Sequence, residues 1–167
     1  LARGFSEVEK KLSTMGDKNP GEVLKTVGMT LVSTVGGASG PLYGTGFMKM
    51  GMELKDTADV TVEDFVRVFQ VAIEGISLRG KSTTGEKTML DSMVPAKNAM
   101  EEALAAGKSP KEAVACGVAA AKEGIEYTKT IAATKGRASY LGDRSIGHQD
   151  PRATSFTMML EILEGVL

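Results

Sequence analysis

The sequence of 167 residues is poor in several residue types. It has one cysteine, Cys116, one histidine and no tryptophan, and aromatic residues make up only 5% of it. A single cysteine excludes an intrachain disulfide and fits a reducing compartment such as the cytoplasm. No run alternates apolar and polar residues over the length of a strand. These absences argue against a disulfide-rich secreted domain and against a sheet protein.

The charges are nearly balanced. Lys and Arg number 20 and Asp and Glu 21, so the formal net charge is −1. The sequence therefore lacks the basic excess that would favour nucleic acid or an anionic membrane as a partner. Its length suits one domain, and we expect a single domain over residues 1–167. Because helical apolar spacing begins at once with Phe5, Val8 and Leu12, we expect this domain to be incomplete at its N-terminus.

Helix start signals recur along the chain. Asn19 precedes Pro20, Ser109 is followed three residues later by Glu112 as in a capping box, and Thr61 opens a variant of that box. Apolar spacing predicts helices over 1–12, 20–35, 41–54, 61–80, 88–106 and 110–135, a long polar loop at 136–153 and a last helix after it. We therefore expect an all-α fold, an up-and-down antiparallel bundle.

A glycine-rich stretch, GGASGPLYGTG at 36–46, lies inside a segment, 26–48, that has no charged residue. The segment is long enough to span a membrane, but its glycines and Pro41 break the helix that a span requires. Two interpretations remain open. Small residues allow helices to pack closely, and bare backbone N–H groups with the Ser39 hydroxyl, before a helix start near Pro41, are typical of a phosphate site.

Two further patterns are weaker. Residues 75–82, GISLRGKS, match the Walker A pattern letter by letter. That motif needs a strand before the phosphate loop, whereas an amphipathic helix comes before it here, so we interpret the match as accidental. His148 lies in the long polar loop, where a hydrogen bond that orders the loop and a place in a site are both open.

Longer motifs narrow these alternatives. TVGMTLVSTVGGASGPLYGT at 26–45 and KGRASYLGDRSIGHQDP at 135–151, with GEKTMLD at 85–91 between them, resemble the nucleotide-binding L subunit of dihydroxyacetone kinase, the DhaL family. The resemblance covers essentially the whole chain, in order. It implies an up-and-down barrel of eight antiparallel helices, of which about seven fall in this chain, with ADP or ATP bound at one end.

The resemblance also implies the residues of the nucleotide site. Phosphates meet the loop of Gly37, Ala38 and Ser39. Arg137 offsets charge on the transferred group and is the one residue given a catalytic role. The general base is expected on the K subunit. The other positions line the nucleotide pocket or belong to a lid over it: Gly80, Met89, Asp150, Pro151 and Arg152.

Two departures from the family pattern stand out. The family binds two Mg²⁺ ions through a D-x-x-x-x-D-x-D-H-G type motif, which is absent from these residues and is expected upstream of Leu1. Because phosphoryl transfer depends on metal to offset charge, we expect this chain alone to bind nucleotide poorly and to be inactive. Arg152 stands where the family usually has Gly. If φ is positive there, Arg costs about 1–2 kcal/mol.

The resemblance implies a function and its partners. The chain is expected to be a cytoplasmic ADP- or ATP-binding subunit that transfers a phosphoryl group to dihydroxyacetone held on a K subunit. A phosphotransferase-system M subunit, carrying phosphohistidine, is the expected donor, because the chain has no fused K domain. The alternatives are an ATP-dependent dihydroxyacetone or fatty-acid kinase domain and a non-catalytic regulatory module. No nucleic acid and no membrane are expected as partners.

Overall fold

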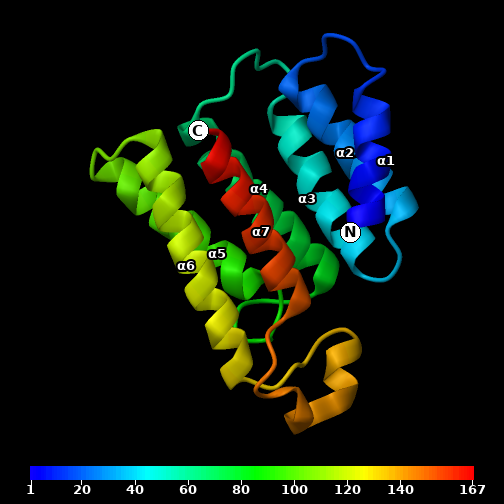
Figure 1. Cartoon of the computed structure of the whole chain (residues 1–167), viewed down its shortest axis with the longest axis vertical. Coiled ribbons are helices and arrows are strands. Elements are labelled where there is room, and N and C mark those ends of the chain that lie inside the picture. Colours follow the sequence, from blue (N-terminus) through cyan, green and yellow to red (C-terminus); the bar gives the residue numbers. More distant parts are fainter. The chain divides into compact units, whose positions relative to one another are not determined.

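The structure is a computed structural model that describes all residues from Leu1 to Leu167 (Figure 1). It is entirely helical, with seven α-helices and one 3-10 helix and no strand, which confirms the predicted fold class. In chain order the elements are α1 (Ala2–Leu12), α2 (Pro20–Thr34), α3 (Ser39–Glu53), α4 (Val62–Gly80), α5 (Leu90–Ala105), α6 (Pro110–Thr130), η1 (Arg137–Ser145) and α7 (Pro151–Val166).

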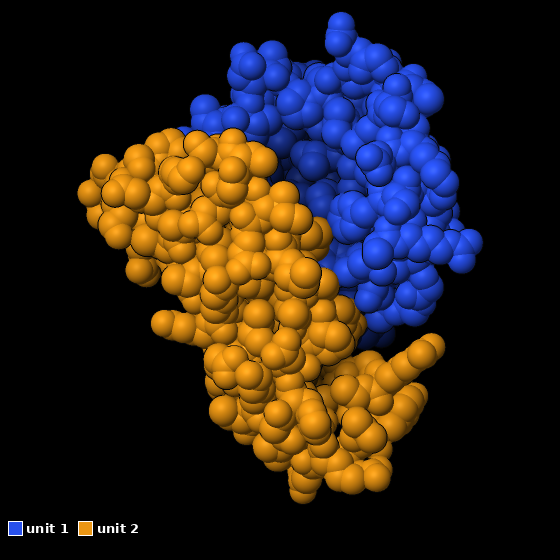
Figure 2. All heavy atoms as spheres, viewed as in Figure 1, with its two compact units in different colours: residues 1–81 blue, residues 82–167 orange.

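The chain divides into two compact units, Leu1–Lys81 and Ser82–Leu167 (Figure 2). In the first unit each of the helices α1 to α4 packs against the next one in the sequence. In the second unit α5 and α6 form a tight pair, and α7 packs against both of them. Each unit thus has helix-on-helix packing of its own.

The predicted helix starts are confirmed by side-chain caps. Asn19 accepts a hydrogen bond from the backbone N–H of Glu22 at 2.9 Å, at the start of α2. Thr61 and Ser109 each form a capping box, with Asp64 and Glu112 as the returning carboxylates. Because these side chains satisfy N–H groups that a helix leaves unpaired, the local sequence alone determines where α2, α4 and α6 begin.

The uncharged segment packs where α2 meets α3. A Cβ on Gly28 would lie 2.7 Å from the backbone oxygen of Gly44, and a Cβ on Gly21 would lie 2.7 Å from that of Gly51. The two backbones therefore approach as closely as only glycine permits. Close packing accounts for the glycines inside the helices, and no helix of the structure has the length and apolar character that a membrane crossing needs.

The second unit uses the same device. A Cβ on Gly124 of α6 would lie 2.2 Å from the backbone oxygen of Asp91 on α5, and one on Gly117 would lie 2.6 Å from the Met100 side chain. The two helices are held this close along buried apolar residues of both: Leu90, Met93, Ala96, Met100, Ala113, Val114, Val118 and Ala121.

Two predicted boundaries are wrong. Helix α6 ends at Thr130 instead of near residue 135, and the loop expected at 136–153 contains η1 and the first turn of α7. The carbonyls of Thr128, Lys129 and Ile131 explain the early end. They accept hydrogen bonds from Lys87 and from the N–H of Gly147, so tertiary partners replace the amides of a further helical turn.

Candidate functional site

The N-terminus of α3 differs from those of α2, α4, α6 and α7, because no side chain caps it. Its N-cap residue is Ala38, which has no polar side-chain atom. Gly37 has φ +69, a conformation that favours glycine, and a Cβ on Gly36 or Gly37 would meet no atom within 4 Å. Both glycines are exposed, and Ser39 is half-buried beside them.

This loop fits an anion. The first N–H groups of a helix lack partners inside the helix, and the helix dipole favours negative charge at that end. Bare backbone in front of a 15-residue helix, with room where side chains would otherwise stand, allows phosphate oxygens to approach these N–H groups. Gly37, Ala38 and Ser39 are therefore brought together in a form that can bind phosphate.

The Walker-like stretch is helical. Gly75 is buried inside α4, where a Cβ would lie 3.1 Å from the Lys49 side chain. Gly80 is the last residue of α4, and Lys81 follows it in a left-handed conformation with φ 48. With no strand before the loop, the match to Walker A is accidental, as interpreted from the sequence.

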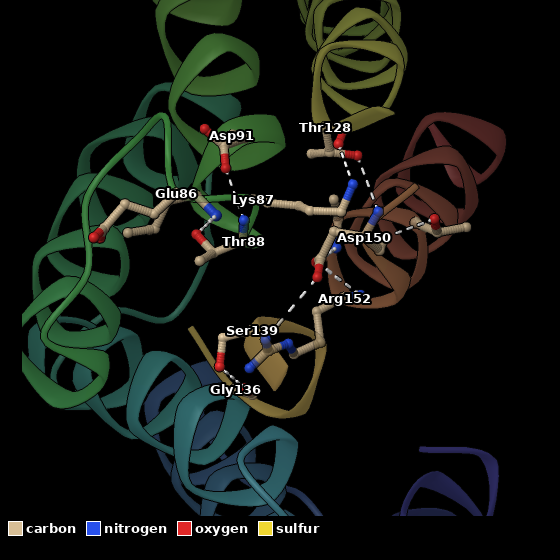
Figure 3. A network of polar contacts seen from close by, with 12 residues as sticks. Glu86, Lys87, Thr88, Asp91, Thr128, Gly136, Ser139, Asp150 and Arg152 are labelled. Carbon is tan, nitrogen blue, oxygen red and sulfur yellow. Dashed lines mark hydrogen bonds and ion pairs between the residues drawn. The ribbon is translucent and has the colours of Figure 1, made fainter. Parts of the chain in front are cut away.

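In the second unit, the buried carboxylate of Asp91 organises the GEKT loop, residues 85–88 (Figure 3). Its Oδ1 accepts a hydrogen bond from the N–H of Gly85 at 2.5 Å, and its Oδ2 accepts one from the N–H of Thr88 at 2.7 Å. These bonds fix the loop against the first turn of α5. Met89, which follows the loop as the N-cap of α5, is buried.

Lys87 extends from this loop and is only 3% exposed. Its Nζ donates hydrogen bonds to the backbone carbonyls of Thr128, of Ile131 at 3.3 Å and of His148 at 2.5 Å. Burial lowers the pKa of Lys87, and the nearby Asp150 carboxylate opposes this shift. The ammonium group thus joins the GEKT loop to the end of α6 and to the approach to α7.

Asp150 is the N-cap of α7, with Pro151 in the first helical position. Its Oδ1 accepts hydrogen bonds from the N–H groups of Arg152 at 3.0 Å and Ala153 at 2.8 Å, and its own N–H donates to the Thr128 hydroxyl at 2.9 Å (Figure 3). Burial raises the pKa of Asp150, although these N–H donors oppose the rise. The Asp150 carboxylate thus caps the N-terminus of α7.

Arg152 lies in the first turn of α7, and its φ is not positive, since Lys81 and Lys87 are the only non-glycine residues with positive φ. The backbone strain that a positive φ would cause at Arg152 is therefore absent. The guanidinium lies 4.0 Å from the Asp150 carboxylate, and its Nη2 would lie 3.2 Å from a Cβ on Gly136. The Arg152 side chain thus lies beside Gly136, the residue that precedes Arg137 in the sequence.

Arg137 is the first residue of η1 and is exposed. Gly136 before it has φ +64, and the hydroxyl and N–H of Ser139 both donate to the Gly136 carbonyl. Asp150, Pro151 and Arg152 are therefore brought to the same part of the second unit as Gly136 and Arg137. Gly37, Ala38, Ser39 and Gly80 belong to the first unit.

The sequence matches the profile of the DAK2 domain over residues 1–165. The chain belongs to the Dak2 domain family. It is 43% identical over 163 residues to the ADP-binding subunit DhaL of PEP-dependent dihydroxyacetone kinase from Escherichia coli, covering 98% of this chain and 78% of that one. The DhaL subunit of kinase 1 from Listeria innocua is also 43% identical (98% and 76% covered), and that of the PTS-dependent kinase from Lactococcus lactis is 40% identical (98% and 77%).

The fold is shared with a solved kinase. The dihydroxyacetone kinase of C. freundii in its native form superposes with a TM-score of 0.66 at 23% identity, over 89% of this chain and 24% of that one. The same kinase in complex with AMP-PNP and Mg²⁺ gives 0.62 at 24% identity with the same coverage. At this level of identity the likeness establishes the fold of this family member.

A metal does not fit the residues of this Dak2 chain. No group of three or more His, Cys, Asp or Glu side chains is placed to hold an ion. Asp91 and Asp150, the buried carboxylates of the second unit, already accept hydrogen bonds from backbone N–H groups. No step that depends on Mg²⁺ can therefore be assigned to these residues.

Sequence reasoning missed the buried polar network around Lys87, Asp91 and Thr128. The GEKT stretch reads as an exposed polar loop, and nothing in its spacing indicates that a lysine inside it is buried. The family motif GEKTMLD contained the only signal, since it includes both Lys87 and Asp91. The His148 side chain is exposed, and it is the backbone of His148 that takes part in the loop-ordering hydrogen bonds.

Proposed function

We propose that this chain is the ADP-binding subunit of a dihydroxyacetone kinase, which delivers a phosphoryl group to dihydroxyacetone held on a separate K subunit. The observation that carries the proposal is the match to three DhaL subunits at 40–43% identity, over 98% of this chain and 76–78% of theirs. These relatives are named as ADP-binding subunits of kinases. The open glycine loop before α3 supplies the phosphate cradle that such a subunit requires.

Each site residue then has a role in binding. The N–H groups around Gly37, Ala38 and Ser39 hold phosphate oxygens, and the exposed guanidinium of Arg137 offsets negative charge on the group to be transferred. Gly80 and Met89 line the nucleotide pocket. Asp150, Pro151 and Arg152 shape the lid. ADP, when bound, would carry the phosphoryl group. The residues named here would bind ADP and orient its phosphates.

The donor in this proposal is a phosphohistidine protein, the M subunit of a phosphotransferase system. The names of the relatives support it, since they call their kinases PEP-dependent or PTS-dependent. In such a relay ADP stays bound as a coenzyme. The K subunit and the M subunit are then the protein partners, and the single cysteine fits a cytoplasmic location.

Binding of ADP with a Gly37→Ala variant tests the proposal. We expect isothermal titration calorimetry in magnesium-containing buffer to show weak binding that falls about a further tenfold in the variant, because Ala at positive φ strains the loop by ~1–2 kcal/mol and its Cβ enters the cradle. Gly16→Ala is the matched control, since Gly16 has φ +65 and equally open surroundings outside the loop. Equal affinity of Gly37→Ala, Gly16→Ala and the unchanged protein would contradict the assigned cradle.

A further inference from the structure

The segment from Ile131 to Gln149, called the 131–149 segment below, leaves the second unit as a closed loop. At its base the N–H of Ala133 donates to the Ser145 hydroxyl at 2.8 Å, and the N–H of Gly147 donates to the Lys129 carbonyl at 2.7 Å. Its tip is exposed, with Tyr140 at 86%. The base therefore determines where the exposed residues of the segment, Arg137 among them, are held.

Lys87 is the charged group at this base. Its three hydrogen bonds reach carbonyls on both ends of the segment, since Thr128 and Ile131 lie at the end of α6 and His148 lies just before α7. The three donors of a lysine ammonium are thereby all used. The carbonyls at the end of a helix also carry partial negative charge, which favours a cation there.

Two features of Lys87 are energetically unfavourable. Its φ of 58 lies in the left-handed region, where non-glycine residues are uncommon, and its ammonium group is taken out of water. Asp91 holds the backbone in this conformation by accepting the N–H groups of Gly85 and Thr88 on either side. A strained backbone and a buried charge at one residue, both held by neighbours, mark it as more than core filling.

A second set of contacts also joins the GEKT loop to the 131–149 segment. Glu86 lies 3.5 Å from the Lys135 ammonium, accepts a hydrogen bond from the Thr134 hydroxyl at 3.3 Å, and accepts the N–H of Thr134 through its carbonyl. The GEKT loop therefore contacts the residues directly before Gly136 and Arg137. Movement of Lys87 would be passed to Arg137 over this short stretch.

We propose that Lys87 is a positioning residue, which clasps the two ends of the 131–149 segment and thereby holds Arg137 where it can meet the phosphates of a bound nucleotide. The clasp itself follows from the contacts of the second unit. Its effect on nucleotide rests on the proposed function, so the two parts need separate measurements.

Hydrogen exchange tests the clasp. In a Lys87→Met variant, which keeps the stem of the side chain and removes its donors, we expect the amides of Ala133 and Gly147 to exchange about tenfold faster or more, since hydrogen bonds from a charged donor are stronger than those between neutral groups. Lys97→Met is the matched control, because Lys97 lies on α5 in the same unit and pairs only with Glu101 of that helix. Unchanged exchange in Lys87→Met would overturn the proposal.

A double-mutant cycle tests the effect on Arg137. We expect Lys87→Met and Arg137→Ala each to weaken ADP binding about tenfold, and Arg137→Ala to have little further effect when Lys87 is already replaced. A merely structural lysine would leave the effect of Arg137→Ala the same in both backgrounds, which would overturn the positioning role. If the unchanged protein binds no ADP, the proposed function fails, and the exchange experiment still decides whether the clasp exists.

Should Lys87→Met fail to fold, Ser145→Ala replaces it in the cycle. The Ser145 hydroxyl closes the same base by accepting the N–H of Ala133 and donating to the Gly142 carbonyl at 2.7 Å, and its loss buries no unpaired charge. We expect the same non-additivity with Arg137→Ala. Additive effects of Ser145→Ala and Arg137→Ala on ADP affinity would contradict the idea that the base of the segment positions Arg137.

Discussion

At the scale of single residues, Asp150 combines two roles that can be separated. Its carboxylate caps α7 by accepting the N–H groups of Arg152 and Ala153, and it is buried at 2% exposure. The hydrogen bonds of the cap stabilise α7 and favour the ionised carboxylate, whereas burial disfavours ionisation. Because burial has the larger effect, the pKa of Asp150 is raised. An amide side chain keeps the cap and removes the charge.

We therefore predict effects of different size for two substitutions of Asp150. Asp150→Ala loses the cap and is expected to lower the free energy of unfolding by about 1 kcal/mol or more. Asp150→Asn keeps an oxygen acceptor and is expected to change the stability near neutral pH by less than that. Urea unfolding of both variants, followed by circular dichroism, measures the difference. Equal loss in the two variants would show that the charge, and not the cap, is what α7 requires.

The pH dependence of the same variants has a definite sign. A group whose folded pKa is raised stabilises the protein below its unfolded pKa, ~3.9 for Asp, and this contribution is lost as the pH rises through the folded pKa. Between pH 4 and 7.5 the free energy of unfolding of the unchanged protein should therefore fall, relative to that of Asp150→Asn, as the pH rises. A difference that grows in its favour would contradict the raised pKa.

At the scale of elements, glycine governs how closely α5 and α6 approach. A Cβ on Gly124 would lie 2.2 Å from the Asp91 carbonyl and 2.8 Å from the Ser92 Cα, both of which are backbone atoms that cannot turn away. We predict that Gly124→Ala lowers the free energy of unfolding by about 1–3 kcal/mol, as overpacking does. Thermal or urea unfolding measures the loss.

Gly165→Ala is the matched control for that substitution. Gly165 lies near the end of α7, and a Cβ there would meet no atom within 4 Å. Because Ala favours a helix more than Gly does, we expect the control to be neutral or to stabilise by up to about 1 kcal/mol. A loss of stability at Gly124 no larger than the change at Gly165 would mean that α5 and α6 can move apart without cost.

Element boundaries were predictable where the signal is local. Asn19, Thr61 and Ser109 cap the helices that they were predicted to begin, since a cap depends only on residues within one turn. The end of α6 was not predictable, because the carbonyls near Thr128 are taken by Lys87, 41 residues earlier in the chain. A lysine in a polar stretch gives no sign of a partner so far away.

The candidate site was predictable to a similar degree. The open loop of Gly37 to Ser39 follows from glycine and a missing cap, both of which are local features. The possible strain at Arg152 was not realised, because the family motif gives residue types and not the backbone conformation, and Arg152 lies inside α7. The roles of the site residues in nucleotide binding stay predictions.

At the scale of the whole molecule, identity to its relatives bears on the phosphoryl donor. The chain is 40–43% identical to three DhaL subunits of PEP-dependent and PTS-dependent kinases, and 33% identical to the L-erythrulose 1-kinase of Mycolicibacterium smegmatis. The higher identity to the first group favours a relay in which a phosphohistidine protein is the donor.

Reconstitution decides between the donors. We predict that the protein, extended upstream of Leu1 by the Asp motif of the family and mixed with a dihydroxyacetone-binding K subunit and a phosphohistidine-carrying M subunit, forms dihydroxyacetone phosphate from phosphoenolpyruvate. ATP in place of the M subunit should support a much lower rate, since a coenzyme that stays bound does not exchange with free ATP. Arg137→Ala should lower the rate without preventing complex formation. Equal turnover with ATP would make the protein an ATP-dependent kinase, and a stable complex that turns over with neither donor would make it a regulatory module.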